Sequence, residues 1–84
     1  MDPESLLEQL QLLADKLGIE VRSEPLDGPG GLCVVKGAQV LFVDSEAPVE
    51  EQAHVMCRAL AKQDLGGVFI VPEVRDVLER YQKG

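Results

Sequence analysis

The sequence predicts a small α+β domain that contains a helix, a strand, a β-hairpin, a second helix, a short extended segment and a third helix, in that order. Three observations predict this class. Apolar residues recur at helical spacing in three segments, two apolar runs flank a short turn, and 84 residues suffice for one domain only. We therefore expect a single domain over residues 1–84, with a small, largely antiparallel sheet and the helices on one face of it.

The first helix is expected to begin at Asp2 and Pro3, because a carboxylate at the N-cap and a proline at the first helical position both favour a helix start. Gly18 can adopt the left-handed conformation that ends a helix. Residues 19–22 then alternate between apolar and charged side chains, which is typical of a half-buried strand. Between Pro3 and Gly18, leucines at spacings of four, three and four residues form one apolar stripe. They are Leu6, Leu10, Leu13 and Leu17.

Two apolar runs, residues 32–35 and 40–43, predict the hairpin. Residues 36–39 separate them, and Gly37 at the first central position of a two-residue loop predicts a type II′ turn. Both arms carry apolar side chains on both faces, whereas a strand with one solvated face would alternate. We therefore expect each face of the hairpin to be covered by other parts of the chain or by a partner.

Pro48, followed by two glutamates at the positive end of the helix dipole, predicts the start of the second helix. We expect this helix to end at Leu65, Gly66 and Gly67. Residues 68–71 form either a fourth strand or a buried connection, because periodicity does not distinguish the two. Pro72 is expected to begin the third helix.

The formal net charge of −7 argues against binding to a nucleic acid, because proteins that bind the phosphate backbone usually present a basic surface. Residues 1–51 hold 11 acidic and 3 basic side chains, whereas residues 52–84 hold 4 acidic and 5 basic ones. The ordinary interpretation is a set of solvated faces and favourable helix starts. The functional alternative is a basic or amphiphilic partner on the acidic side.

No run of about 18 apolar residues is present, so we expect no membrane association. The acidic start of the chain differs from a signal peptide, which begins with basic residues followed by an apolar run. A cytoplasmic location is expected from these two features. Cys33 and Cys57 are then expected to be free thiols in apolar surroundings, with a disulfide between them as the alternative.

His54 and Cys57 lie three residues apart on the second helix, so their side chains can approach each other. One hypothesis is a thiolate activated by the imidazole, or half of a metal site. The other is a boundary histidine beside an inert core cysteine. The glycine-rich segment at 28–31 precedes a strand rather than a helix, which differs from a phosphate-binding loop. We expect no catalytic, metal-binding or cofactor-binding residues, and thus no enzyme.

Roughly half of the chain, from Leu13 to Leu60, resembles the core of ImmA/IrrE-type zinc metallopeptidases. The resemblance rests on Leu17-Gly18-Ile19-Glu20-Val21, on Gly30-Gly31, on the hairpin that ends in Val43-Asp44, and on Pro48-Val49-Glu50-Glu51-Gln52. It implies a helix, a strand, a glycine-containing link and a hairpin that lead into the helix which carries His-Glu-x-x-His in that family.

At the position of that motif the chain reads Cys57-Arg58-Ala59-Leu60-Ala61. Both histidine ligands and the general base are therefore missing, and His54 lies one helical turn too early. The resemblance implies a shared scaffold at most, without peptidase activity.

The sequence therefore predicts a non-catalytic protein-interaction module, either self-associating as a homodimer or acting as a small accessory subunit for another protein. A decayed metallopeptidase-like domain that still binds a peptide or a partner is the alternative. Two-fold association would cover an apolar face of the hairpin. The expected interface residues are Leu32, Val34, Val35, Leu41 and Val43.

Overall fold

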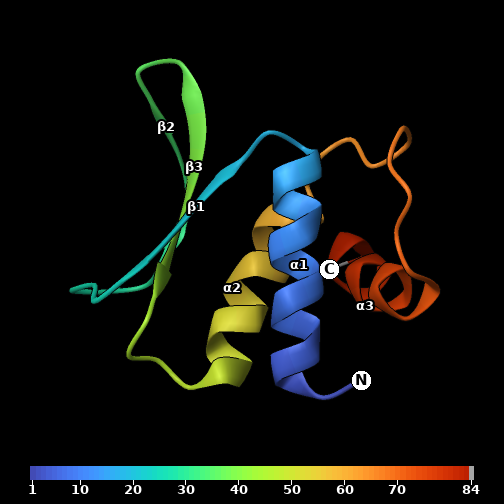
Figure 1. Ribbon diagram of the computed structural model, residues 1–84, viewed down its shortest axis with the longest axis horizontal. Helices are drawn as coiled ribbons and strands as arrows, with labels where there is room; N and C mark the ends of the chain where they lie inside the picture. Colours follow the sequence, from blue (N-terminus) through green and yellow to red (C-terminus); the bar gives the residue numbers. More distant parts are fainter. Residues whose placement is uncertain (84) are drawn as a thin grey trace.

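A computed structural model describes residues 1–83 of the chain and confirms the α+β class and the order of the helices and strands (Figure 1). The helices and strands, in chain order, are α1 (Pro3–Lys16), β1 (Glu20–Glu24), β2 (Gly31–Val35), β3 (Ala38–Asp44), α2 (Val49–Leu60) and α3 (Pro72–Lys83). None of the helices in residues 1–83 is long and apolar enough to span a membrane.

The sheet is mixed, with β3 in the centre and β1 and β2 at the two edges. β2 runs antiparallel to β3 and forms the expected hairpin with it, whereas β1 runs parallel to β3. The segment between β1 and β2 crosses β3 to reach the opposite edge of the sheet. Gly30 is required in this crossing, because a Cβ atom there would overlap the backbone carbonyl group of Phe42.

The helices lie on one face of the sheet, as expected, and form two layers (Figure 1). α1 and α2 pack side by side against the strands, whereas α3 packs behind them and contacts no strand. Within residues 1–83, no helix lies against the opposite face of the sheet (Figure 1). We call it the open face.

The register of the strands decides which side chains point to the helices. Leu41 pairs with Val21 of β1 and with Leu32 of β2, and all three point toward α1 and α2. Together with Val43, they meet the apolar stripes of the helices in the single core of the domain. The largest fully buried side chains are Leu10, Ile19, Leu41, Met56, Leu60, Leu78, Val43, Val74 and Cys57.

The predicted helix ends are confirmed for α1. The side chain of Asp2 caps it by accepting a hydrogen bond of 2.9 Å from the backbone N–H of Ser5, and this bond lowers the pKa of the Asp2 carboxyl. Gly18 follows the helix with a positive φ of 76°.

Three details differ from the expectations or decide between them. α2 ends at Leu60, because the chain already turns at residues 61–62, before the glycine pair at which the helix was expected to end. The hairpin turn consists of Lys36 and Gly37, both with positive φ, so it is of type I′ rather than type II′. The expected loop was placed one residue too late because Ala38 already belongs to β3. Residues 68–71 form a connection rather than a fourth strand, and Ile70 is buried within it.

Candidate interaction surfaces

Two of the expected interface residues belong to the core. Leu41 is 0% exposed and Val43 is 2% exposed, and both pack against the helices. Their place in the interface is therefore a wrong prediction. The error arose because both faces of the hairpin are apolar, so that the sequence does not show which face receives the helices.

The other three expected residues lie in β2. Leu32 is half-buried and packs against the core, on the same face as Leu41. Val34 and Val35 point to opposite faces near the hairpin turn, and they are 72% and 38% exposed. They are accessible because the end of the hairpin extends beyond α1 and α2 (Figure 1).

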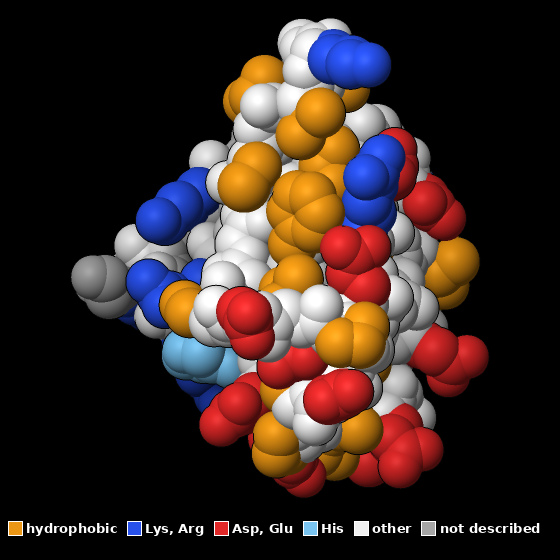
Figure 2. Space-filling model, turned by 90° about the vertical axis from the view of Figure 1, so that its left-hand side faces the viewer, with side chains coloured by type: hydrophobic (Ala, Val, Ile, Leu, Met, Phe, Trp, Pro, Cys, Tyr) orange, Lys and Arg blue, Asp and Glu red, His pale blue; other side chains and the backbone are white. Residues whose placement is uncertain are grey.

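The open face carries an apolar surface that the expected interface includes only in part. Cys33 pairs with Val40, and Val35 pairs with Ala38, so these side chains share the open face with Phe42. Figure 2 shows hydrophobic side chains along this side of the molecule, with charged side chains beside them. Val40 points to this face but is only 2% exposed. We call the accessible set the open-face strip, which consists of Cys33, Val35, Ala38 and Phe42.

Charged side chains of β1 border the open-face strip. The guanidinium group of Arg22 lies 6.0 Å from the centre of the Phe42 ring and donates a hydrogen bond to Glu20. This hydrogen bond and the negative charge of Glu20 raise the pKa of Arg22. Glu20 and Glu24 share the face with Arg22, so the β1 edge of the sheet is strongly charged.

The opposite edge of the sheet has a different character. β2 reads Gly-Leu-Cys-Val-Val and contains no charged residue. Within residues 1–83, no backbone hydrogen bond joins the outer edge of β2 to another segment. Exposed edge strands usually carry charges or other protection against pairing, so β2 is an unprotected edge.

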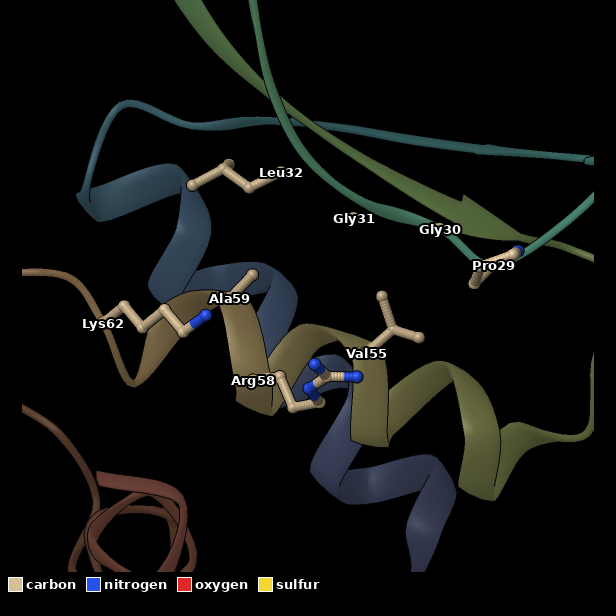
Figure 3. Close-up of a pocket in the computed structure, with 8 residues that line it drawn as sticks. All are labelled: Pro29, Gly30, Gly31, Leu32, Val55, Arg58, Ala59 and Lys62. Atoms are coloured by element: carbon tan, nitrogen blue, oxygen red, sulfur yellow. The ribbon is translucent and has the colours of Figure 1, made fainter. Parts of the chain in front are cut away.

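A hollow of about 230 Å³ separates the start of β2 from α2 (Figure 3). Pro29, Gly30, Gly31 and Leu32 form one wall. Val55, Arg58, Ala59 and Lys62 form the other, and they project from one face of α2 and the turn after it. We call this hollow the β2–α2 groove. Sequence analysis did not single out Arg58 and Lys62 as a pair, because only the fold places them beside a free strand edge.

The structure decides between the two hypotheses for His54 and Cys57. Nδ1 of His54 lies 2.8 Å from the hydroxyl of Tyr81 in α3, with no hydrogen bond between the imidazole and Cys57. Cys57 is 1% exposed, and burial raises the pKa of its thiol from 9.0 to about 11. The thiol is thus protonated at neutral pH, which is typical of an inert core cysteine.

Cys33 and Cys57 are both free thiols, one on the surface and one in the core. Residues 1–83 contain no cluster of three or more His, Cys, Asp or Glu side chains that could hold a metal ion. The glycine-rich segment leads into β2, as expected, rather than into a helix.

Comparisons with protein-family models, curated proteins and solved structures find no match to this chain. The resemblance to ImmA/IrrE-type metallopeptidases therefore stays a prediction. Positions 57 and 61, which correspond to the two histidine positions of that motif, are Cys57 and Ala61, and both side chains are buried.

Proposed function

We propose that the protein is a non-catalytic interaction module that forms a homodimer through the open face of its sheet. The observation that carries this proposal is that helices cover only one face, although both faces of the hairpin are apolar. A sheet with a solvated face would alternate apolar and polar residues along its strands. The apolar residues 32–35 of β2 and 40–43 of β3 do not alternate with polar residues in this way.

A second copy of the chain is a suitable occupant of this face. Closed two-fold dimers are the commonest assemblies, and they bring the same surface patch of two copies together. The strip lies at β3 and β2, while the charges of β1 lie to one side, so a two-fold axis through the strip would bury the apolar residues centrally. Each large aliphatic side chain buried in this way would contribute roughly 1.5–3 kcal/mol before the cost of association.

A non-catalytic role is supported by the surroundings of Cys57 and His54, the thiol and the imidazole that could take part in nucleophilic catalysis. The Cys57 thiol is buried and protonated, and His54 contacts Tyr81 instead of a nucleophile. The β2–α2 groove is lined by two basic residues without a carboxylate or histidine, so it offers no acid–base pair. No cofactor is part of the proposal.

The second candidate is a decayed metallopeptidase-like domain that retains partner binding. It is supported by the order of the elements from the end of α1 to α2, which agrees with the order that the resemblance implies. The groove beside α2 is the surface that such a domain would retain.

A cytoplasmic location, without membrane or nucleic acid as a partner, is also part of the proposal. The basic residues of α3 support the last point, because Arg75 and Arg80 alternate along the helix with Glu73, Asp76 and Glu79. Such a mixed face is screened rather than attractive to phosphate.

The homodimer can be tested by charge substitution at the two neighbouring valines. Val35 lies on the open face, whereas Val34 lies on the other face and is more exposed. We expect Val35→Lys to convert the dimer to a monomer, because it buries an unpaired charge in the interface. Val34→Lys is the matched control and is expected to leave the dimer intact. Light scattering during size-exclusion chromatography measures both masses.

A monomeric wild-type protein at tens of micromolar would refute the homodimer. Equal effects of the two substitutions would show that the contact involves the strand edge or both faces of the hairpin rather than the open face. Circular dichroism of both variants distinguishes a dissociated fold from an unfolded chain.

A further inference from the structure

We propose that the β2–α2 groove binds an extended, acidic peptide segment of another protein, which adds to the sheet as a fourth strand beside β2. This site lies on a different surface from the open-face strip, so it goes beyond the proposed homodimer. It also assigns a ligand class to the groove that the second candidate would retain, but it is argued from the groove itself and does not depend on that candidate. The proposal rests on three features of the groove: the free strand edge, the two basic side chains and the spacing between them.

The free edge provides the backbone recognition. β2 is five residues long, and its outer N–H and C=O groups have no partner in residues 1–83. A peptide that adds to such an edge gains main-chain hydrogen bonds whatever its sequence, and the neighbouring side chains then determine specificity. β2 has no charged side chains that would oppose pairing with another strand. β1, at the other edge, carries Glu20, Arg22 and Glu24.

The basic side chains provide the preference for acidic residues. Arg58 and Lys62 are both exposed, and neither forms an ion pair with another residue in the range 1–83. Among the described residues, no acidic side chain lines the groove, although the whole chain has a net charge of −7. The groove is therefore a small basic surface on an acidic protein, and charge complementarity favours a partner with carboxylates.

The spacing of Arg58 and Lys62 matches that of alternate residues in a strand. The chain keeps its helical course past Leu60, because Ala61 remains in the right-handed helical region. Four residues of helix rise by about 6 Å. Two residues of a β-strand rise by about 6.6 Å. Acidic residues at positions i and i+2 of an added strand would thus face the groove together and reach one basic side chain each.

The chain runs in the same direction along both walls of the groove, in β2 and in α2. The spacing of residues in an added strand therefore stays matched to the spacing of the basic side chains on α2. Figure 3 shows Pro29 and Gly30 near Val55, and Leu32 nearer to Ala59 and Lys62. Val55 and Ala59 provide the apolar part of the α2 wall, which we call the apolar floor of the groove because it lies between the strand edge and the basic residues. The methylene groups of a glutamate can lie on this floor while its carboxylate reaches Arg58 or Lys62.

A second copy of this chain fits the groove poorly. Pairing of two β2 edges around a two-fold axis would bring the two α2 helices alongside each other. Arg58 and Lys62 of one copy would then lie near the same residues of the other, which is an unfavourable arrangement of like charges. β2 itself also carries no acidic residue to offer to the groove.

The test measures fluorescence anisotropy of a labelled peptide in which glutamate and valine alternate. We expect it to bind the wild-type chain, and we expect binding to weaken as salt rises, because ion pairs at an open groove are screened. A peptide with alternating lysine and valine should not bind. Methylation of alternate backbone nitrogens on the acidic peptide should abolish binding if it pairs with β2.

Substitutions locate the site. Arg58→Glu together with Lys62→Glu is expected to weaken binding of the acidic peptide at least about tenfold, which corresponds to about 1.4 kcal/mol. The same double variant should gain affinity for the lysine–valine peptide. Arg75→Glu, an exposed basic residue of α3 away from the groove, is the matched control and should leave binding unchanged.

Ala38→Lys, which places a charge on the open face from β3 rather than from β2, should retain peptide binding even as a monomer, so failure of the homodimer and failure of this proposal are distinguishable. Acidic-peptide binding that survives reversal of Arg58 and Lys62 would overturn the proposal, as would the absence of any binding. Equally tight binding of a short single-stranded DNA would assign the groove to phosphate. A changed oligomeric mass of the Arg58→Glu, Lys62→Glu variant would show that the groove binds a second copy of this chain. Both outcomes contradict the peptide proposal.

Discussion

Burial determines the chemistry of the most reactive side chain in this protein, the thiol of Cys57. Desolvation of the buried side chain disfavours the charged thiolate, and it raises the pKa of this thiol to about 11. Cys33, the same residue type, lies on the surface of β2. The two cysteines therefore differ in exposure because of their positions in the fold.

This difference leads to a prediction for alkaline pH. The folded state holds the Cys57 proton up to about pH 11, whereas an exposed thiol loses it near the ordinary value of 9.0. Between these values the folded state binds more protons than the unfolded state, so the contribution of this thiol to stability falls as pH rises from 9 to about 11. Below pH 9 this contribution is fully present.

Urea unfolding at several pH values measures the effect. The difference in the free energy of unfolding between wild type and Cys57→Ala should be constant below pH 9 and shrink between pH 9 and about 11. A Cys33→Ala variant, which removes a surface thiol instead of a buried one, is the control. A difference for Cys57→Ala that stays constant across this range would contradict the prediction.

At the scale of elements, the hairpin turn contains a local conflict between sequence and conformation. Lys36 has a φ of 51°, in the left-handed region that a side chain with a Cβ atom adopts at a cost. Gly37, with a φ of 82°, adopts this region freely. The type I′ turn favours Asn-Gly at these two positions, so Lys36 is the less favourable of the pair.

We therefore expect Lys36→Asn to stabilise the protein by about 0.5–1 kcal/mol, because asparagine tolerates the left-handed conformation better than lysine. Thermal unfolding followed by circular dichroism measures the change. Lys36→Ala is the control: it removes the same charge without this conformational tolerance and should give no stabilisation. Equal stabilisation by both variants would attribute the gain to charge rather than to the backbone.

At the scale of the whole molecule, one core holds the sheet and both helix layers together. α3 contacts the helices but no strand, so the sheet depends on α1 and α2 for its cover. A domain of this size is stable by only roughly 4–13 kcal/mol. The loss of one central side chain therefore removes a large share of the total stability.

Leu41, in the central strand, tests this dependence. We expect Leu41→Ala to lower the free energy of unfolding by about 2–5 kcal/mol, because it leaves a cavity between the sheet and the helices. The matched truncation Val34→Ala, on the same face but near the exposed end of the hairpin, should change it by less than about 0.5 kcal/mol. Urea unfolding of both variants provides the comparison. A similar cost at both positions would show that Leu41 is not central to the core.

The sequence by itself determined the local elements of this protein. The cap at Asp2, the leucine stripe of α1, the glycine at position 18 and the apolar hairpin runs each depend on residues within a few positions of one another. Helical and strand periodicity act at that range, which is why the α+β class and the order of the elements follow from them.

Tertiary structure alone decided which face of the hairpin is buried and where β1 pairs. Leu41 and Phe42 are neighbours of similar apolar character, and only the packing of α1 and α2 places the first in the core and the second on the open face. The same packing brings Arg58 and Lys62 beside the edge of β2, which lies far from them in sequence. These are long-range pairings that depend on the cooperative burial of all the apolar faces, so no local pattern of residues contains them.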